Sequence, residues 1–430
     1  MEATKYRQSF QNHFQRFRGS IPLINNWLLV GFAFFMTFYR PAIEGILALV
    51  VLLWLVEGRF RDKLTTAYRN KVVLGFVLLF GVYHLGLLWS DDVTRSFNYL
   101  LHLELKYLLL PLIFVTVLRY EFIHRIITAF LLGMLVNEAV SYGIFFGWLS
   151  PTKYGHPGDP TPFMSHLPYS LLLAFTSLMI LYRLFEDRLS RTEKILHVIF
   201  FLTVTTNLFI QGGRAGQLLF FVTMVVMFLF LFRKNLVKAI LIPLVILSGV
   251  FSLAYDHSDT FKYRLNKGLH DIKKIEKGNY YTSWGNRVAS AIASYEVFKQ
   301  NPLLGVGTGD HIRAVHGYIK KKRKDLRIVL RYKHLHNQYS NIATQFGLLG
   351  LGVLFYLFYQ IFRYPQEDRF LKHLQLMLLV MTIIYFGIER PIGGYFGYIF
   401  IVSMFAFTLV RKEEGKKEVA PDAGFEPATK

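Results

Sequence analysis

Long apolar segments alternate with short polar connections along almost the whole chain. A helix needs about 20 mainly apolar residues to cross the hydrocarbon core of a membrane, and twelve segments approach that length. Hydrophobic residues make up 53% of the 430 residues and aromatic residues 17%, which also fits a membrane protein. We therefore predict an all-α polytopic membrane protein with about twelve spans at 24–39, 41–57, 72–89, 98–118, 122–149, 167–185, 193–211, 214–232, 237–255, 339–362, 373–388 and 393–410.

The basic residues between these segments predict the orientation. Every second connection is rich in Lys and Arg, for example Arg59, Arg61, Lys63, Arg69 and Lys71 after the second segment. The short connections on the other side hold one basic residue each, namely Arg40, Arg95, Lys153, Arg214 and Arg390. Because basic loops stay in the cytoplasm, both termini are expected there.

The connection at 256–338 is the exception, since it faces outward and is by far the longest. It holds 17 Lys and Arg against 7 Asp and Glu. Such an excess of positive charge favours an anionic partner carrying phosphate or pyrophosphate. The Lys320–Lys324 run within it could instead be a solvated surface strip.

These patterns divide the chain into five parts. A basic, aromatic segment at 1–22 is expected to lie on the cytoplasmic face of the membrane. Spans one to nine occupy 23–255, and spans ten to twelve occupy 339–410. The large outer loop at 256–338 separates them and is expected to be mainly helical. A polar cytoplasmic tail follows at 411–430.

Polar side chains capable of chemistry gather just before the tenth span. Asn337 and Ser340 are good N-cap residues, so His336 is expected beside a helix N-terminus, whose partial positive charge favours a neutral ring. His334 and Asn337 flank it. Ala343, Gly347 and Gly350 follow on one face, where small residues let another membrane helix approach. The alternative is that both histidines are ordinary loop residues.

Two arginines fall on the same outer side. Arg214 follows Gly212 and Gly213 in a tight turn, where glycine lets a phosphate approach backbone N–H groups at a helix N-terminus. Arg287 begins an amphipathic helix, a position that the helix dipole disfavours for a cation, which suggests a ligand. The alternatives are a headgroup anchor for Arg214 and a surface charge for Arg287.

Lys106 lies with Glu104 inside the fourth predicted span. Charged side chains at that depth usually face a cavity or a partner, so Lys106 is a candidate substrate contact or a member of a structural ion pair. His166, Tyr169, the 157–162 segment and the Glu389–Arg390 pair are candidates to line the same vestibule.

Several kinds of site are missing from the sequence. There is no cysteine, no paired Asp-x-Asp on an exposed loop and no Walker-type nucleotide loop. We therefore expect no metal, no cofactor, no nucleotide and no nucleic acid among the partners.

Together these residues resemble the O-antigen ligase superfamily. The resemblance rests on the His336-Asn337 pair followed after nine residues by Gly347-x-x-Gly350, on Arg214 in its Gly-rich turn, and on the Arg287 helix that ends in Asn-Pro-Leu-Leu-Gly-Val-Gly. It also rests on the dozen spans with a large periplasmic loop between spans nine and ten. The superfamily includes O-antigen ligases, O-antigen polymerases and protein O-oligosaccharyltransferases.

The resemblance implies a metal-independent glycosyltransferase of the bacterial inner membrane with a periplasmic active site. Its donor would be a glycan on undecaprenyl pyrophosphate, and its acceptor, in a ligase, a sugar of the lipid A core. His336 would act as the general base, and Arg214 and Arg287 would bind the pyrophosphate. A polymerase, a protein O-oligosaccharyltransferase and, in a different class, a flippase for a lipid-linked glycan remain the alternatives.

Overall fold

The computed structural model describes residues 2–186 and 189–412. Within these residues the regular structure is helical, apart from one isolated bridge between His156 and Asp159. The predicted tail at 411–430 lies outside them, except for Arg411 and Lys412. The helices are α1 (Glu2–Phe35), α2 (Arg40–Glu57), α3 (Phe60–Arg69), α4 (Lys71–Leu85), η1 (Gly86–Trp89), α5 (Val93–His102), η2 (Leu105–Leu109), α6 (Leu110–Val117), η3 (Tyr120–Phe122), α7 (Ile123–Phe145), α8 (His166–Glu186), α9 (Arg191–Ile210), α10 (Arg214–Leu231), α11 (Leu236–His257), α12 (Asp259–Glu276), α13 (Ser283–Gln300), α14 (His311–Lys322), η4 (Lys324–Arg331), α15 (Gln338–Arg363), α16 (Arg369–Ile388) and α17 (Tyr395–Thr408).

The all-helical membrane architecture is confirmed. Eight of the described helices are long and apolar enough to cross a membrane, or up to ten if each of two bent pairs forms one span. The two remaining predicted segments, 24–39 and 393–410, correspond to the second half of α1 and to the 14-residue α17. The count of twelve spans therefore stays a prediction.

Two predicted segments differ from straight spans. The fourth, predicted at 98–118, breaks after α5, and the chain turns by 64° before it continues through η2 and α6. Glu104 occupies the left-handed backbone region at the break, and Pro111 lies in the first turn of α6, where a missing N–H costs nothing. After α2 the chain turns by 117° into the short α3.

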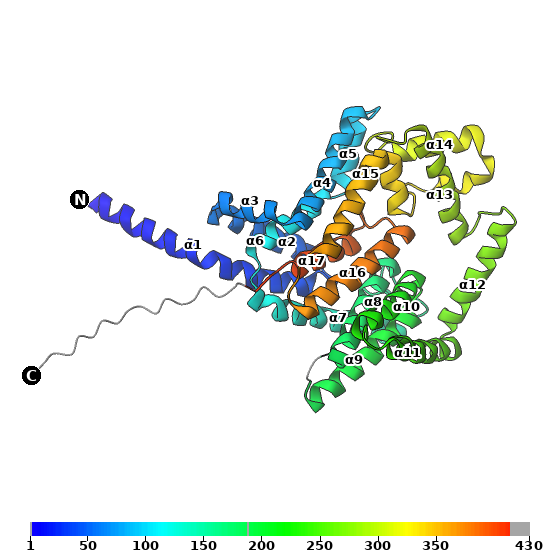
Figure 1. Cartoon of the computed structure of the whole chain (residues 1–430), viewed down its shortest axis with the longest axis horizontal. Coiled ribbons are helices and arrows are strands. Elements are labelled where there is room, and N and C mark those ends of the chain that lie inside the picture. The colour runs from blue at the N-terminus through cyan, green and yellow to red at the C-terminus, as the bar shows by residue number, and fades with distance from the viewer. Residues whose placement is uncertain (1, 187–188, 413–430) are drawn as a thin grey trace, which may run out of the picture.

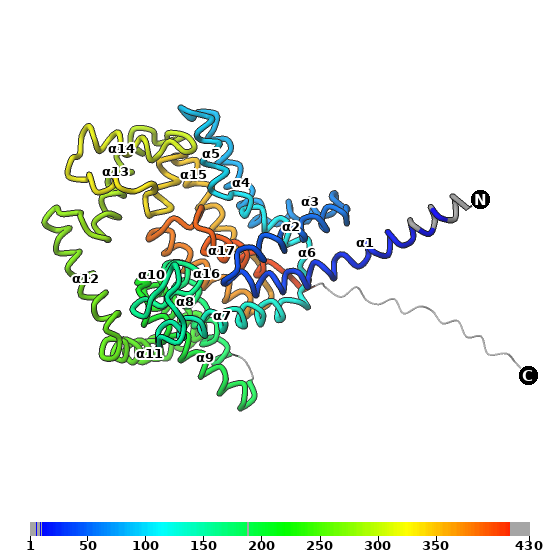
Figure 2. The backbone as a smooth tube through the Cα atoms, turned by 180° about the vertical axis from the view of Figure 1, so that it is seen from behind, coloured from blue at the N-terminus to red at the C-terminus, as the bar shows by residue number. Residues whose placement is uncertain are grey.

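Residues 2–35 form one continuous helix, which includes both the segment predicted to lie on the membrane and the first predicted span. α1 runs without interruption from Glu2 to Phe35, with Pro22 inside it. Its first part projects from the body of the molecule in both views (Figures 1 and 2). Its second part packs on α2 and α7, and the buried side chain of Asn26 donates to the Val117 carbonyl at 2.9 Å.

The membrane helices share one large apolar core. α16 and α17 lie centrally, with α8 and α10 on one side and α4 and α15 on the other (Figure 1). Almost every side chain of α17 is buried. α9 and α11 lie at the edge and leave many of their apolar side chains exposed, as expected of helices that face lipid.

The large loop is mainly helical and has a core of its own. α12 runs along one edge of the molecule from α11 towards α13 and α14 (Figures 1 and 2). Beyond it, α13, α14 and η4 enclose a separate apolar cluster, which contains Ala289, Ala293, Val297, Val315, Ile319, Leu326, Ile328, Val329 and Leu335. This part of the loop therefore folds as a small unit packed against α15.

α15 is broken at Gly347, which has φ +58° and ψ −145°. The loop segment after α13 fills the break: the N–H groups of Leu348 and Leu349 donate to the carbonyls of Pro302 and Leu303, at 2.8 and 3.1 Å. The predicted approach of another membrane helix at this glycine is therefore wrong. The neighbour is loop backbone, which a Cβ on Gly347 would meet at 2.5 Å.

Candidate active site

The first turn of α15 positions His336 as the sequence predicted. Asn337 caps the helix, because its side-chain oxygen accepts from the Ser340 N–H at 2.9 Å. Its amide nitrogen donates to the Gly387 carbonyl at 3.0 Å, which ties the cap to the end of α16. His336 precedes the cap in a left-handed conformation, with φ +48°.

Glu389 is the side chain that His336 faces. It follows the last residue of α16, and its Oε2 lies 3.4 Å from Nδ1 of His336. Both side chains are largely buried, with exposed fractions of 17% for His336 and 14% for Glu389. Burial opposes ionisation of Glu389, but hydrogen bonds from His336 and from the Arg390 N–H hold its pKa at about 2. The histidine therefore faces a carboxylate that is ionised near pH 7.

His334 lies against His336, with ring centroids 4.1 Å apart. Burial, together with repulsion from His336 and Arg390, lowers the pKa of His334 to about 4, so this ring is neutral near pH 7. The ligand atoms of His334, His336 and Glu389 all lie within 4.8 Å of one another. Imidazole and carboxylate ligands at such distances could hold a divalent metal ion, which makes the expected absence of a metal a matter for experiment.

Arg287 belongs to the same cluster. Its Nε donates to the Ile388 carbonyl at 3.0 Å, and its Nη2 lies 4.0 Å from Oε2 of Glu389. Its Nη1 donates to the Ser283 hydroxyl one turn earlier, at 3.2 Å. The guanidinium is therefore fixed by groups from both α13 and the end of α16.

Arg214 reaches the same hydroxyl from the first residue of α10. Its Nη2 donates to Ser283 Oγ at 3.4 Å, and its guanidinium carbon lies 5.9 Å from the centre of the Trp284 ring. Its Nη1 is buried without a hydrogen-bond partner among the described residues. Ser283 thus joins the two arginines, and Glu389 joins Arg287 to His336.

The turn before Arg214 is shaped by packing. The N–H of Gly212 donates to Asp159 at 2.8 Å, and that of Gly213 donates to the Gln211 side chain at 3.1 Å. A Cβ on Gly213 would lie 2.5 Å from Cβ of Ser170. If the Gly213 N–H binds an anion, as predicted, it must therefore release the Gln211 side chain first.

Lys106 makes its described contacts away from this cluster. Its ammonium lies 3.1 Å from Oε2 of Glu44 on α2 and 5.1 Å from the centre of the Tyr107 ring. Glu104 pairs with Arg40 instead. These contacts correspond to the structural ion pair that the sequence left open, whereas a role of Lys106 in substrate binding stays a prediction.

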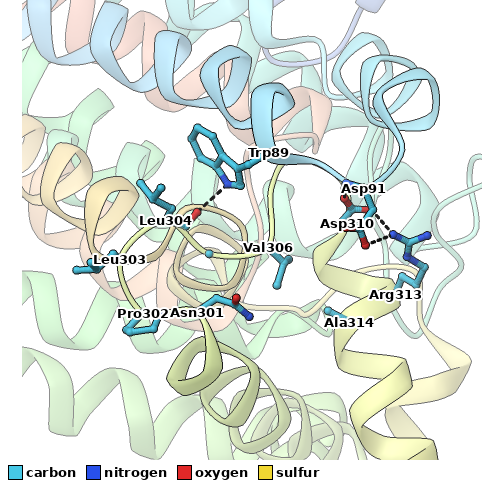
Figure 3. A pocket seen from close by; sticks show the side chains of 11 residues that line it. Trp89, Asp91, Asn301, Pro302, Leu303, Leu304, Val306, Asp310, Arg313 and Ala314 are labelled. Carbon is cyan, nitrogen blue, oxygen red and sulfur yellow. Dashed lines mark hydrogen bonds and ion pairs between the residues drawn. The ribbon is translucent and has the colours of Figure 1, made fainter.

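A cavity of about 670 Å³ lies beside the loop segment 301–306, which contacts α15. Figure 3 shows Trp89 on one side, where its Nε1 donates to the Leu304 carbonyl at 3.0 Å. On the other side Arg313 approaches Asp91 and Asp310. Neither His336 nor the two arginines of the cluster line this cavity, so it is a separate feature.

A comparison with protein families finds a match over part of the chain. Residues 199–355, from within α9 to within α15, match the family model described as O-antigen ligase. This match to part of the chain supports the resemblance to the O-antigen ligase superfamily. A search of curated proteins finds no match.

The O-antigen ligase match covers Arg214, Arg287, His334 and His336. Glu389 lies beyond it, and the sequence indicated Glu389 only as a residue that could line the vestibule. Ser283 lies four residues before Arg287, and no pattern in the sequence marks its hydroxyl. Both were missed as site residues because their contacts join segments more than 50 residues apart in the chain. The superfamily indicates glycan transfer of the ligase or polymerase type by a multi-pass bacterial membrane protein.

Proposed function

We propose that the chain is an O-antigen ligase, a glycosyltransferase that moves a glycan from undecaprenyl pyrophosphate to a sugar of the lipid A core on the periplasmic face of the inner membrane. One observation carries the proposal. The three residues that the resemblance assigns to catalysis and pyrophosphate binding, His336, Arg287 and Arg214, lie in one polar cluster joined by Ser283 and Glu389.

His336 is the general base in this proposal. A tautomer with its proton on Nδ1 donates to Glu389 and leaves Nε2 free to accept the proton of the acceptor hydroxyl. The charge on Glu389 also stabilises the imidazolium that forms, as a carboxylate partner does in other base-assisted transfers. The half-buried ring of His334, which is neutral near pH 7, adds no competing positive charge.

Arg214 and Arg287 bind the leaving group. As the acceptor oxygen forms its bond to the anomeric carbon, the bond from that carbon to the pyrophosphate oxygen breaks, and negative charge grows on the departing group. Fixed guanidinium groups stabilise such charge through paired hydrogen bonds. The resemblance further implies inversion at the anomeric carbon.

The decisive test compares wild type with His336→Ala in liposomes. The purified chain receives an undecaprenyl-pyrophosphate glycan and lipid A core without nucleotide or added metal, and glycan joined to core is measured on gels. His257→Ala is the matched control, because His257 lies at the end of α11 and its described hydrogen bond is to Leu253 of the same helix. We expect joining in wild type and in the control, and none in His336→Ala.

Other products would identify the alternatives. A lengthened lipid-linked glycan with unchanged core would identify a polymerase, glycan attached to an added acceptor protein would identify an O-oligosaccharyltransferase, and transport of the glycolipid without a product would contradict enzyme activity. A chelator arm tests the metal question. Activity that survives chelation supports His336 as a base, whereas loss of activity that zinc restores would make His334, His336 and Glu389 metal ligands.

A further inference from the structure

A second, larger cavity lies at the opposite end of the membrane helices from His336. Its volume is about 1100 Å³, and its walls come from the start of α4 and the ends of α6, α15 and α17. His336 and Glu389 lie at the other ends of α15 and α16. The basic connections of the sequence place this cavity on the cytoplasmic side.

The rim of the cavity is strongly basic. Six of its lining residues are cations and one, Glu121, is a carboxylate; the cations are Arg69, Lys71, Arg119, Arg363, Arg411 and Lys412. All six are exposed. Within the described part of the chain only Arg119 has a carboxylate within 4.0 Å, that of Glu121 at 3.8 Å. The remaining five positive charges face the cavity mouth without an acidic partner among these residues.

The floor of the cavity is apolar. Leu118, Leu409 and Val410 lie there and are almost fully buried. Two tyrosine rings stand between floor and rim: the Arg411 guanidinium lies 5.0 Å from the ring centre of Tyr364, and the Lys412 ammonium 5.2 Å from that of Tyr120. Apolar walls below a ring of cations match an amphiphile that has an anionic head.

α3 gives the depth of the cavity in the membrane. It contributes Thr66 and Arg69 to the lining and packs on α4 and α6. Phe60, Leu64 and Tyr68 lie four residues apart on its exposed face, while the chain bends by 117° between α2 and α3. A short helix with such a face lies in the membrane interface, which sets the cavity at the level of the lipid headgroups.

We propose that this cavity binds the phosphate group of an anionic phospholipid, with the headgroup among the cations and the start of the acyl chains against the apolar floor. Basic pockets between membrane helices on the cytoplasmic side suit such headgroups, and arginine forks suit phosphate oxygens. The site is independent of the proposed glycan transfer, since it lies at the other ends of the helices.

Native mass spectrometry of the full chain in detergent tests the proposal. Phosphatidylglycerol, phosphatidylcholine and inorganic phosphate are the probes, and the variant is Arg363→Gln with Arg411→Gln. The matched control is Arg191→Gln with Arg233→Gln, which removes the same amount of charge. Both arginines are exposed, lie on the same expected side of the membrane and do not line the cavity. Thermal unfolding in phosphatidylcholine checks that both variants are folded.

We expect wild type to bind phosphatidylglycerol more tightly than phosphatidylcholine. The cavity variant should lose affinity for phosphatidylglycerol by about tenfold or more, since each cation near the headgroups contributes about 1 kcal/mol, and the control should stay close to wild type. Equal losses in both variants, or no preference for phosphatidylglycerol, would overturn the proposal. Displacement of the lipid by millimolar inorganic phosphate would also overturn it, because the site would then take a free anion.

Discussion

Glu389 contacts both the proposed general base, His336, and the proposed pyrophosphate ligand, Arg287. One of its carboxylate oxygens lies near both the His336 ring and the Arg287 guanidinium, while the other accepts from the Arg390 N–H. Arg287 holds its position by further bonds to Ile388 and Ser283, but His336 has no other described acidic partner within 4.0 Å. Loss of the Glu389 charge should therefore affect proton transfer more than pyrophosphate binding.

Replacing Glu389 with Gln tests this division of roles. We expect kcat to fall by about 100-fold, the scale of general base catalysis, with little change in KM for the lipid-linked donor. Glu296→Gln is the control, since Glu296 pairs with Lys299 on the surface of α13. A rise in KM at constant kcat would instead assign Glu389 to donor binding.

His334 should make the stability of the folded chain depend on pH. Burial lowers its pKa to about 4 from an ordinary value of 6.5, so the unfolded chain binds the additional proton first. The contribution of neutral His334 to the free energy of unfolding is fully present above pH 6.5 and is lost as the pH falls towards 4. We expect the thermal midpoint of His334→Gln to decrease less steeply than that of wild type as the pH is lowered from 6.5 to 4.

Part of the pH slope should remain in that variant. Burial also lowers the pKa of His311 to about 3, so His311 acts in the same direction. Wild-type and His334→Gln curves that run parallel between pH 7 and pH 4 would show that His334 does not titrate in this way.

At the level of helices, the crossing of the 301–309 segment with α15 fixes the candidate site in place. Gly305, Gly307, Gly309 and Gly347 all have positive φ, and the N–H groups of Val306 and Gly307 donate to the carbonyls of Thr344 and Gln345 at 2.9 Å. This close contact holds the end of α13 against the N-terminal turns of α15. Arg287 lies in the first half of α13, and His336 lies just before the start of α15.

Alanine at Gly305 or Gly347 should therefore destabilise the fold. A left-handed conformation costs an L-residue about 1–2 kcal/mol, and the added Cβ would lie 2.3 Å from Gln345 or 2.5 Å from Leu303. We expect a lower thermal midpoint and lower activity together. Gly352→Ala is the matched control in the same helix, because nothing lies within 4 Å of its Cβ position, and it should be neutral or slightly stabilising.

The contact between α5 and α14 depends on one buried carboxylate. Asp310 is 2% exposed and accepts from the Ser90 hydroxyl at 2.7 Å, the Asp91 N–H at 2.8 Å and the guanidinium groups of Arg95 and Arg313. Asp310→Asn should cost about 2 kcal/mol, because it removes a buried charged acceptor from the Ser90 hydroxyl, the Asp91 N–H and two partly exposed guanidinium groups. Exposed Asp91→Asn should cost less than about 1 kcal/mol, and equal thermal midpoints for the two variants would contradict this account.

For the whole molecule, periodic and composition signals predicted the architecture, whereas contacts between distant segments could not be predicted. Apolar runs located the helices, and the N-cap pattern placed His336 correctly before α15. The bend at Glu104 and the break at Gly347 depend on tertiary packing. No local pattern indicated that Pro302 and Leu303 would supply acceptors to a membrane helix. For the same reason the sequence grouped Lys106 with the site, although its described ionic partner is Glu44 on α2.

Two of the contacts that attach the loop to the membrane helices also assemble the candidate site. The Ser283 hydroxyl touches Arg214, and Arg287 is bonded to the last turn of α16. If the loop were lifted from the membrane helices, these two arginines would separate and Arg287 would leave Glu389. In the proposed transfer, such a separation would leave no cation pair to bind the pyrophosphate.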